Sequence, residues 1–130
     1  MKCVLFVALL GGCLNPSIAV AQTISGNTLY ESCTSDQIGL EGFCVGYIAG
    51  LVEGQFWGGL LLAKMAGIEL ETQDFNAFAN QAFQHCIPPE APNEQLRDVV
   101  VAHLRDNPAT RHESARFLVW EAYREAFPCK

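Results

Sequence analysis

The sequence predicts an all-α fold, a single small helical bundle of about four to five helices braced by disulfides. Helical spacing of apolar residues recurs along the chain, and strand-like alternation persists nowhere after residue 22. An even number of cysteines follows the N-terminal segment, as is typical of small exported proteins. No domain-length repeat or low-complexity linker occurs, so residues 22–130 are expected to form one domain.

Residues 1–21 have the pattern of a signal peptide. Lys2 precedes an apolar run at 3–10 (CVLFVALL), and a breaker stretch then leads to the small-x-small site at 19–21 (AVA). We expect cleavage after Ala21 and export of the mature chain. Residues 10–13 (LGGC) also resemble a bacterial lipobox, so a lipid on Cys13 is the alternative.

The charge balance of the mature chain is strongly acidic. Without Lys2, seven Lys and Arg residues face fourteen Asp and Glu residues. Nucleic acids and anionic membrane surfaces bind basic patches, so neither is an expected partner. A basic protein partner is compatible with this charge.

Two helices are predicted in the first half of the mature chain. Residues 25–33 form a short helix that opens at Ser25 or Asn27. Residues 40–66 are the longest apolar stretch of the mature chain, with apolar residues at three- and four-residue steps. Gly67 is a natural end for this second helix.

A stripe of glycines crosses the second helix, one every four residues. A glycine costs up to about 1 kcal/mol relative to alanine in a helix, so five in register need a structural reason. Another backbone can approach closely along such a stripe. We expect a contact between helices of one chain; a homodimer interface is the second interpretation, and a membrane span, which Glu53 disfavours, is the third. The stripe consists of Gly42, Gly46, Gly50, Gly54 and Gly58.

Three further helices are predicted after this stretch. Residues 72–83 carry one apolar face, and residues 93–106 carry another behind Asn93, a suitable N-cap. Pro108 suits the first turn of a last helix at 109–127. No span long and apolar enough for a membrane is expected in the mature chain.

The cysteines of the mature chain are expected to form two disulfides. An up-and-down path of the helices would bring all four to one end of the bundle, and it favours Cys44–Cys86 with Cys33–Cys129. The pairing Cys33–Cys44 with Cys86–Cys129 remains open. No C-x-x-C spacing supports a zinc or thioredoxin-like site.

The sequence predicts no catalytic residue, no metal site and no cofactor. A cysteine nucleophile needs a free thiolate, and disulfides would consume all four sulfurs. His85 beside Cys86 is interpreted as the flank of a structural bridge. No phosphate-binding loop, G-x-S-x-G or H-E-x-x-H motif occurs, so we expect a protein that is not an enzyme.

Short motifs occur in a fixed order along the mature chain. They are 26–30 (GNTLY) with Cys33, 43–50 (FCVGYIAG), 83–89 (FQHCIPP), 95–100 (QLRDVV), 104–108 (LRDNP) with Arg111, His112 and Ala115, and 127–129 (FPC). Together they resemble the Rap/Tai family, the immunity proteins of type VI secretion amidase effectors. Gly54, Gly58 and the stretch at 57–60 (WGGL) are not part of the family's pattern.

The resemblance implies a periplasmic, all-helical protein, commonly a homodimer, that binds and occludes a peptidoglycan-cleaving amidase. Two other functions stay open. One is a periplasmic helical binding or chaperone-like module, and the other is a membrane-associated protein that assembles through its Gly-x-x-x-Gly helix.

We expect the residues that determine partner specificity to lie outside the family motifs, notably between residues 64 and 74. Glu69, Glu71 and Asp74 form an acidic cluster at the expected turn between two helices. The functional hypothesis is that they steer a basic rim of the amidase cleft into place. The alternative is that they serve solubility alone.

Overall fold

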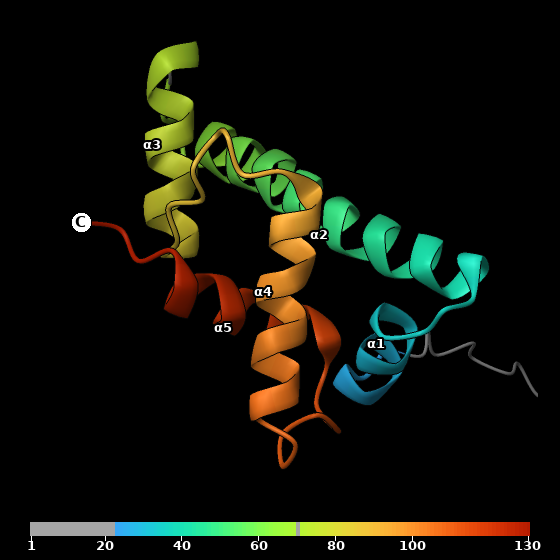
Figure 1. The fold of residues 1–130 in the computed structure, drawn as a ribbon. Helices are drawn as coiled ribbons and strands as arrows, with labels where there is room; N and C mark the ends of the chain where they lie inside the picture. Colours follow the sequence, from blue (N-terminus) through green and yellow to red (C-terminus); the bar gives the residue numbers. More distant parts are fainter. Residues whose placement is uncertain (1–22, 70) are drawn as a thin grey trace, which may run out of the picture.

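The computed structural model describes residues 23–69 and 71–130, and within these ranges it holds helices and no strand. The all-α prediction is confirmed. Residues 1–22, which include the predicted signal peptide and Cys13, lie outside the described residues. The helices are α1 (Gly26–Cys33), α2 (Ile38–Met65), α3 (Thr72–Phe83), α4 (Asn93–Asp106) and α5 (Ala115–Ala126), as drawn in Figure 1.

The ends of the first two helices follow from local residues. Ser25 is the N-cap of α1, where its Oγ accepts a hydrogen bond from the backbone N–H of Thr28 at 3.2 Å. α2 has 28 residues, which makes it about 42 Å long. Gly67 follows it with a φ of 71°, a left-handed conformation that suits glycine, so the predicted end of this helix is confirmed.

The long helix α2 organises the fold. Its first half packs on α1 and α4, and its second half carries α3, whose last residue, Phe83, accepts a hydrogen bond from Nε1 of Trp120 on α5 at 2.8 Å (Figure 1). The core lies between α1, the first half of α2, α4 and α5, where apolar side chains are almost completely buried. Its largest members are Tyr123, Leu29, Ile48, Leu104, Leu118, Val100 and Val119.

Two disulfides join the helices, but the favoured pairing is wrong. Cys33 bonds to Cys44 and Cys86 bonds to Cys129. The reason is length: α2 continues about 31 Å beyond Cys44, whereas the twelve residues of α3 return only about 18 Å. The chain therefore reaches Cys86 far from Cys44, and the up-and-down path that would gather all four cysteines at one end does not form.

The last helix begins later than predicted, at Ala115 and not at residue 109. The preceding turn pairs instead with the chain that enters α1. Gly26 N–H donates to the carbonyl of Glu113 at 2.9 Å, and Asn27 N–H donates to that of Arg111 at 2.7 Å. These bonds hold the backbone of the turn in a non-helical path. The guanidinium of Arg111 also lies 4.4 Å from the ring centre of Tyr30, which ties the turn to α1.

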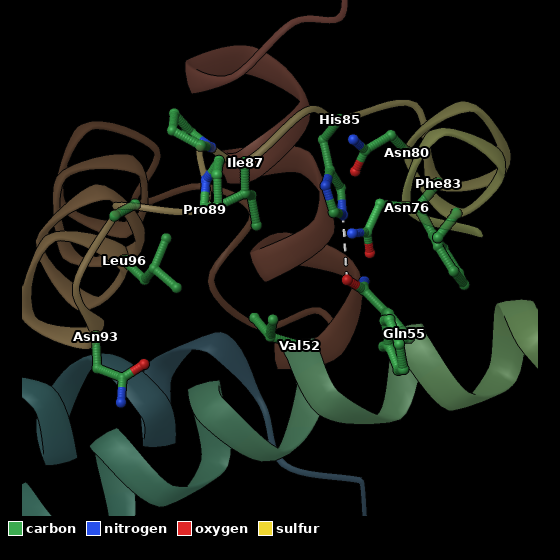
Figure 2. Close-up of a pocket in the computed structure, with 14 residues that line it drawn as sticks. Val52, Gln55, Asn76, Asn80, Phe83, His85, Ile87, Pro89, Asn93 and Leu96 are labelled. Carbon is green, nitrogen blue, oxygen red and sulfur yellow. Dashed lines mark hydrogen bonds between the residues drawn. The ribbon is translucent and has the colours of Figure 1, made fainter. Parts of the chain in front are cut away.

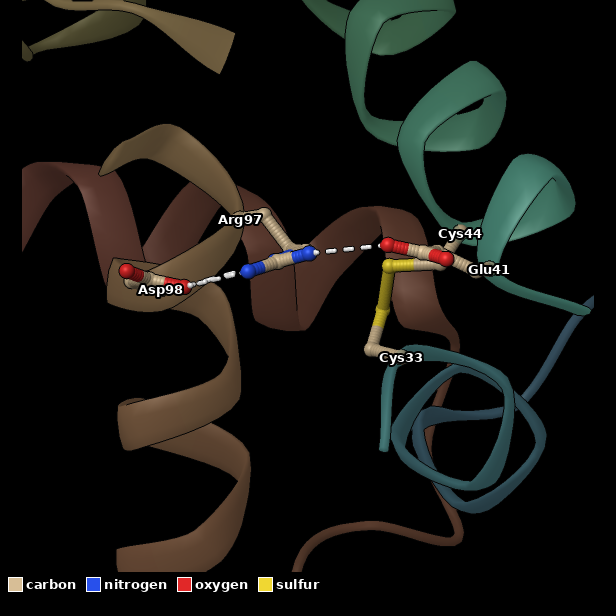
Figure 3. A network of polar contacts seen from close by, with 5 residues as sticks. All are labelled: Cys33, Glu41, Cys44, Arg97 and Asp98. Atoms are coloured by element: carbon tan, nitrogen blue, oxygen red, sulfur yellow. Dashed lines mark hydrogen bonds and ion pairs between the residues drawn. A yellow bond between two sulfur atoms is a disulfide. The ribbon is translucent and has the colours of Figure 1, made fainter. Parts of the chain in front are cut away.

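A small ion-pair network connects α4 to the start of α2 beside the first disulfide (Figure 3). Nη1 of Arg97 lies 3.5 Å from Oε1 of Glu41, and Nη2 of the same guanidinium lies 3.1 Å from Oδ1 of Asp98. Both carboxylates are more than half exposed, so the pairs contribute little to stability. Arg97 instead orients two helices that the buried core already holds together.

Candidate interaction surfaces

The glycine stripe of α2 faces away from the rest of the chain. Among the described residues, a Cβ added at any of its five glycines would meet no atom of another helix within 4 Å, and all five are exposed. The expected contact between helices of one chain is therefore wrong at these positions. The positions concerned are Gly42, Gly46, Gly50, Gly54 and Gly58.

The close contact within the chain is made by Gly59, which the stripe does not include. It is buried against α3, where an added Cβ would lie 3.4 Å from the ring of Phe83 and 3.6 Å from Cβ of Ala79. α2 is apolar all round, so its sequence does not reveal which face carries α3.

Large apolar side chains flank the glycine stripe and are exposed as well. Phe43 is 38 % exposed, Trp57 62 % and Leu61 59 %. We use the name glycine face for the exposed surface of α2 that consists of the five glycines, the apolar side chains beside them from Phe43 onward, and Met65. Extended exposed apolar surfaces on small proteins mark sites of association. Among the described helices none is long and apolar enough to cross a membrane.

The predicted acidic cluster lies at the turn between α2 and α3. Glu69 and Glu71 are exposed, and within the described residues neither forms an ion pair. Asp74 is in the first turn of α3, but its side chain lies outside the described part. The structure thus places two of the three carboxylates on the outer surface, at the opposite end of α2 from α1 (Figure 1).

A pocket of about 280 Å³ lies between α2, α3, the segment that follows α3 and the start of α4 (Figure 2). Its polar lining consists of side-chain amides from three helices together with His85. Asn93 is one of them: it is the first residue of α4 and not its predicted N-cap, a position that Pro92 takes. The amide-bearing residues are Gln55, Asn76, Asn80 and Asn93.

His85 is the most unusual group of this pocket, because it is a polar ring only 6 % exposed. Its Nε2 lies 3.1 Å from Oε1 of Gln55. An amide oxygen only accepts, so Nε2 carries the proton and Nδ1 is bare. Among the residues that the structure describes, Nδ1 has no hydrogen-bond partner although it is buried, and desolvation lowers the pKa of His85. His85 is therefore a neutral imidazole at neutral pH.

The residues around His85 in the sequence do not indicate this role. The residue that contacts it, Gln55, is 30 positions away on α2, a largely apolar helix. Aromatic rings surround the imidazole, with ring centres 6.2 Å away at Phe83 and 5.8 Å away at Tyr123. The polar Gln55 inside an apolar stretch is the one feature that could have pointed to a buried partner.

All four cysteines of the described part are in disulfides, so none there offers a thiol nucleophile. Across residues 23–69 and 71–130, no three His, Cys, Asp or Glu side chains gather as a metal site requires. The surfaces that remain are the glycine face, the acidic turn and the amide-lined pocket, all suited to binding.

Comparison with known proteins gives one match. The model of a protein family described as Rap1a immunity proteins matches residues 25–129, a range that includes all five helices and both disulfides. No curated protein and no solved structure matches the chain.

Proposed function

Because the chain belongs to the family of Rap1a immunity proteins, we propose that it binds and inhibits a peptidoglycan-cleaving amidase effector of a type VI secretion system. The family match over residues 25–129 is the observation that carries this proposal. The family implies that the partner is a secreted effector. The amidase activity of that effector follows from the motif resemblance set out above.

The proposed site of action is the periplasm. Two features of the chain support it: residues 1–21 have the pattern of a cleavable signal peptide, and the described cysteines form two disulfides. We propose cleavage after Ala21, with lipidation of Cys13 as the alternative. Mass spectrometry of the mature protein separates the two, because a lipidated chain keeps Cys13 and gains acyl mass.

Inhibition by this protein is proposed to be stoichiometric and not enzymatic. Both disulfides and the core fix the relative positions of the helices, so the outer surface is presented as a preformed shape. A preorganised surface loses little conformational entropy when it binds. The protein would thus act by covering the effector's cleft.

The acidic turn is proposed to contact the effector. Glu69 and Glu71 are exposed and, among the described residues, unpaired, and Asp74 follows them in the first turn of α3. Opposite charges on two proteins mainly raise the rate of association. A basic rim on the amidase would therefore be guided toward this end of α2.

The glycine face is proposed to join two copies of the chain. If two α2 helices cross antiparallel with the two-fold axis level with Val52, Gly50 of one copy lies opposite Gly54 of the other. In the same register Gly46 lies opposite Gly58, and Phe43 lies opposite Leu61. Small residues thus face small residues at the crossing and large apolar residues meet outside it, a self-complementary pattern that a two-fold dimer requires.

The experiment that tests the function is capture from periplasmic extract with the tagged mature chain. We expect one tightly bound protein that cleaves peptidoglycan, and we expect one equivalent of the chain to abolish that activity. Many weakly bound clients would support a chaperone-like module instead. Extraction only with detergent would support a membrane-associated protein.

The acidic turn is tested in the same assay. The triple variant Glu69→Lys, Glu71→Lys and Asp74→Lys should slow association with the captured amidase at least about tenfold at low salt while the far-ultraviolet circular dichroism stays unchanged. An unchanged association rate would remove the acidic turn from the interface.

A matched control separates the effect of a local contact on the association rate from the effect of a change in net charge. The triple variant Glu31→Lys, Asp36→Lys and Asp106→Lys makes the same charge change at exposed positions away from this turn. We expect its association rate to stay within about threefold of the unmodified protein.

A further inference from the structure

The pocket beside His85 is lined by neutral groups only. Carboxamides of Gln55, Asn76 and Asn80 on α2 and α3 gather near His85, and Asn93 of α4 also lines the pocket (Figure 2); among the described side chains no charged one contributes to the lining. This contrasts with the acidic surface of the protein as a whole, whose net charge is −6. A ligand that enters the pocket is therefore neutral where it is buried, because an unpaired charge there would lose its hydration.

The carboxamides are free to bind. Gln55 uses its oxygen for His85 and keeps its NH₂ group. Within the described residues, no protein group hydrogen-bonds the side-chain amides of Asn76, Asn80 or Asn93. A carboxamide donates and accepts side by side, which matches the N–H and C=O of a peptide backbone.

The apolar part of the pocket adds a place for a side chain. Val52 of α2, Ile87 of the connecting segment and Leu96 of α4 line one side of the cavity in Figure 2. The volume of about 280 Å³ is near the lower end of small-ligand sites. It suits a short segment with one aliphatic side chain.

Two acidic residues lie next in the sequence to residues that line the pocket, which puts their backbones at its rim. Glu90 follows Pro89 directly and Glu94 follows Asn93, and both Pro89 and Asn93 line the cavity. Glu90 and Glu94 are exposed, and among the described residues they take part in no ion pair. A basic residue next to the buried side chain would meet these carboxylates.

We propose that this pocket binds a short peptide segment of another protein, in which an aliphatic residue is buried and a Lys or Arg follows it. The carboxamides bind the peptide backbone, the apolar wall takes the aliphatic side chain and the glutamates at the rim bind the cation. This assignment does not depend on the amidase, because the pocket chemistry alone selects the segment.

The test is a titration of the ¹⁵N-labelled mature protein with N-acetyl-Leu-Lys-amide, followed by NMR. The side-chain NH₂ signals of Gln55, Asn76, Asn80 and Asn93 report on the pocket directly. We expect these signals to shift and saturate with a dissociation constant in the millimolar range, which is usual for so few contacts. No shift of these signals up to about 20 mM probe would overturn the proposal.

Two related probes test which parts of the ligand are recognised. N-acetyl-Leu-Glu-amide should bind at least about fivefold more weakly, because its carboxylate meets the glutamates of the rim. N-methylacetamide should shift the signals only at much higher concentration, because it lacks the aliphatic side chain. Equal binding of all three probes would show that the pocket recognises an isolated amide and not a peptide.

Variants on α3 provide the matched control. The double variant Asn76→Ala and Asn80→Ala removes two carboxamides and introduces a residue that favours helices, so we expect binding about tenfold weaker with the fold kept. Gln81→Ala removes an exposed amide of the same helix that does not line this pocket, and binding should stay within twofold. Equal effects of the two changes would contradict the assignment.

A second copy of the chain is the competing occupant. If it filled the pocket, the same NH₂ signals would move when the protein alone is diluted. We expect them to stay in place over a hundredfold dilution. Movement on dilution would replace the peptide proposal by a contact between copies.

Discussion

Nε2 of His85 and Oε1 of Gln55 lie 3.1 Å apart although 30 residues separate them in the sequence. This hydrogen bond connects the middle of α2 to the segment that leaves α3. It also fixes which imidazole nitrogen carries the proton, and it leaves Nδ1 buried with no partner among the described residues. A second proton on this ring would place an uncompensated charge in the interior.

The stability of the protein is therefore expected to fall in mildly acidic solution. Burial lowers the pKa of His85, so the unfolded chain takes up a proton at this residue before the folded chain does. The neutral ring's contribution to the free energy of unfolding is fully present above the usual histidine pKa of about 6.5. This contribution is lost as the pH falls from there through the lowered pKa of the folded protein. Urea unfolding between pH 8 and pH 5 measures this loss of stability.

The variant His85→Gln is the control for this pH dependence. It cannot titrate, so its free energy of unfolding should change less than that of the unmodified protein between pH 8 and pH 5. His103 and His112 remain in both proteins, and they cancel in the comparison. Parallel pH profiles for the two proteins would contradict the role assigned to His85.

Gly26 is expected to tolerate no side chain. A Cβ at this position would clash with the side chain of Leu118 and would lie 2.9 Å from the carbonyl oxygen of Arg111. Gly26→Ala should lower the free energy of unfolding by about 1–3 kcal/mol, in the range typical of overpacked cores. Gly42→Ala, at a position with nothing within 4 Å, should cause no loss, and equal losses would contradict the packing described at α1.

The two disulfides should differ in their accessibility to reductant. Cys44 is completely buried, whereas Cys129 is exposed near the C-terminus. Thiolate attack requires access to a sulfur, so a mild reductant should open Cys86–Cys129 first. Alkylation followed by peptide mass spectrometry identifies the modified cysteines, and early labelling of Cys33 would contradict this order.

Much of the fold could be predicted from local signals. The N-cap at Ser25, the stop at Gly67 and the helical spacing of apolar residues each depend on neighbours within a few positions. The start of α5 could not, because the backbone of residues 111–115 pairs with the chain entering α1, far away in sequence. A pattern of neighbouring residues gives no information about a partner so distant in the sequence.

The surfaces were harder to predict than the helices, for a related reason. α2 is apolar all round, so glycine at every fourth position is compatible with a buried face and with an exposed one. Which of the two occurs depends on where α3 packs, and Gly59 takes that contact. The disulfide pairing also depends on how distant parts of the chain are placed, here on the length by which α2 extends beyond Cys44.

Tyr123 offers a test of an unpaired buried group. Its hydroxyl is buried and has no hydrogen-bond partner in the described part of the chain, and burial raises its pKa. Tyr123→Phe removes this polar atom and keeps the ring in the core, so the free energy of unfolding should stay unchanged or rise by up to about 1 kcal/mol. A loss greater than about 1 kcal/mol in urea unfolding would mean that the hydroxyl has a partner in solution.

The glycine face makes the proposed dimer testable without disturbing the monomer. Within the described residues an added Cβ at Gly50 would meet no atom of another helix within 4 Å, and the position is exposed, so a leucine there has room within one chain. At the proposed crossing, however, the leucine would meet α2 of the second copy and force the two backbones apart. Analytical ultracentrifugation should therefore show a dimer for the unmodified protein and a monomer for the variant. The monomeric variant should unfold at a urea concentration no lower than that of the unmodified protein at high dilution, since leucine favours helices more than glycine does. A variant that stays dimeric would place the interface elsewhere and would leave this exposed apolar face without a partner.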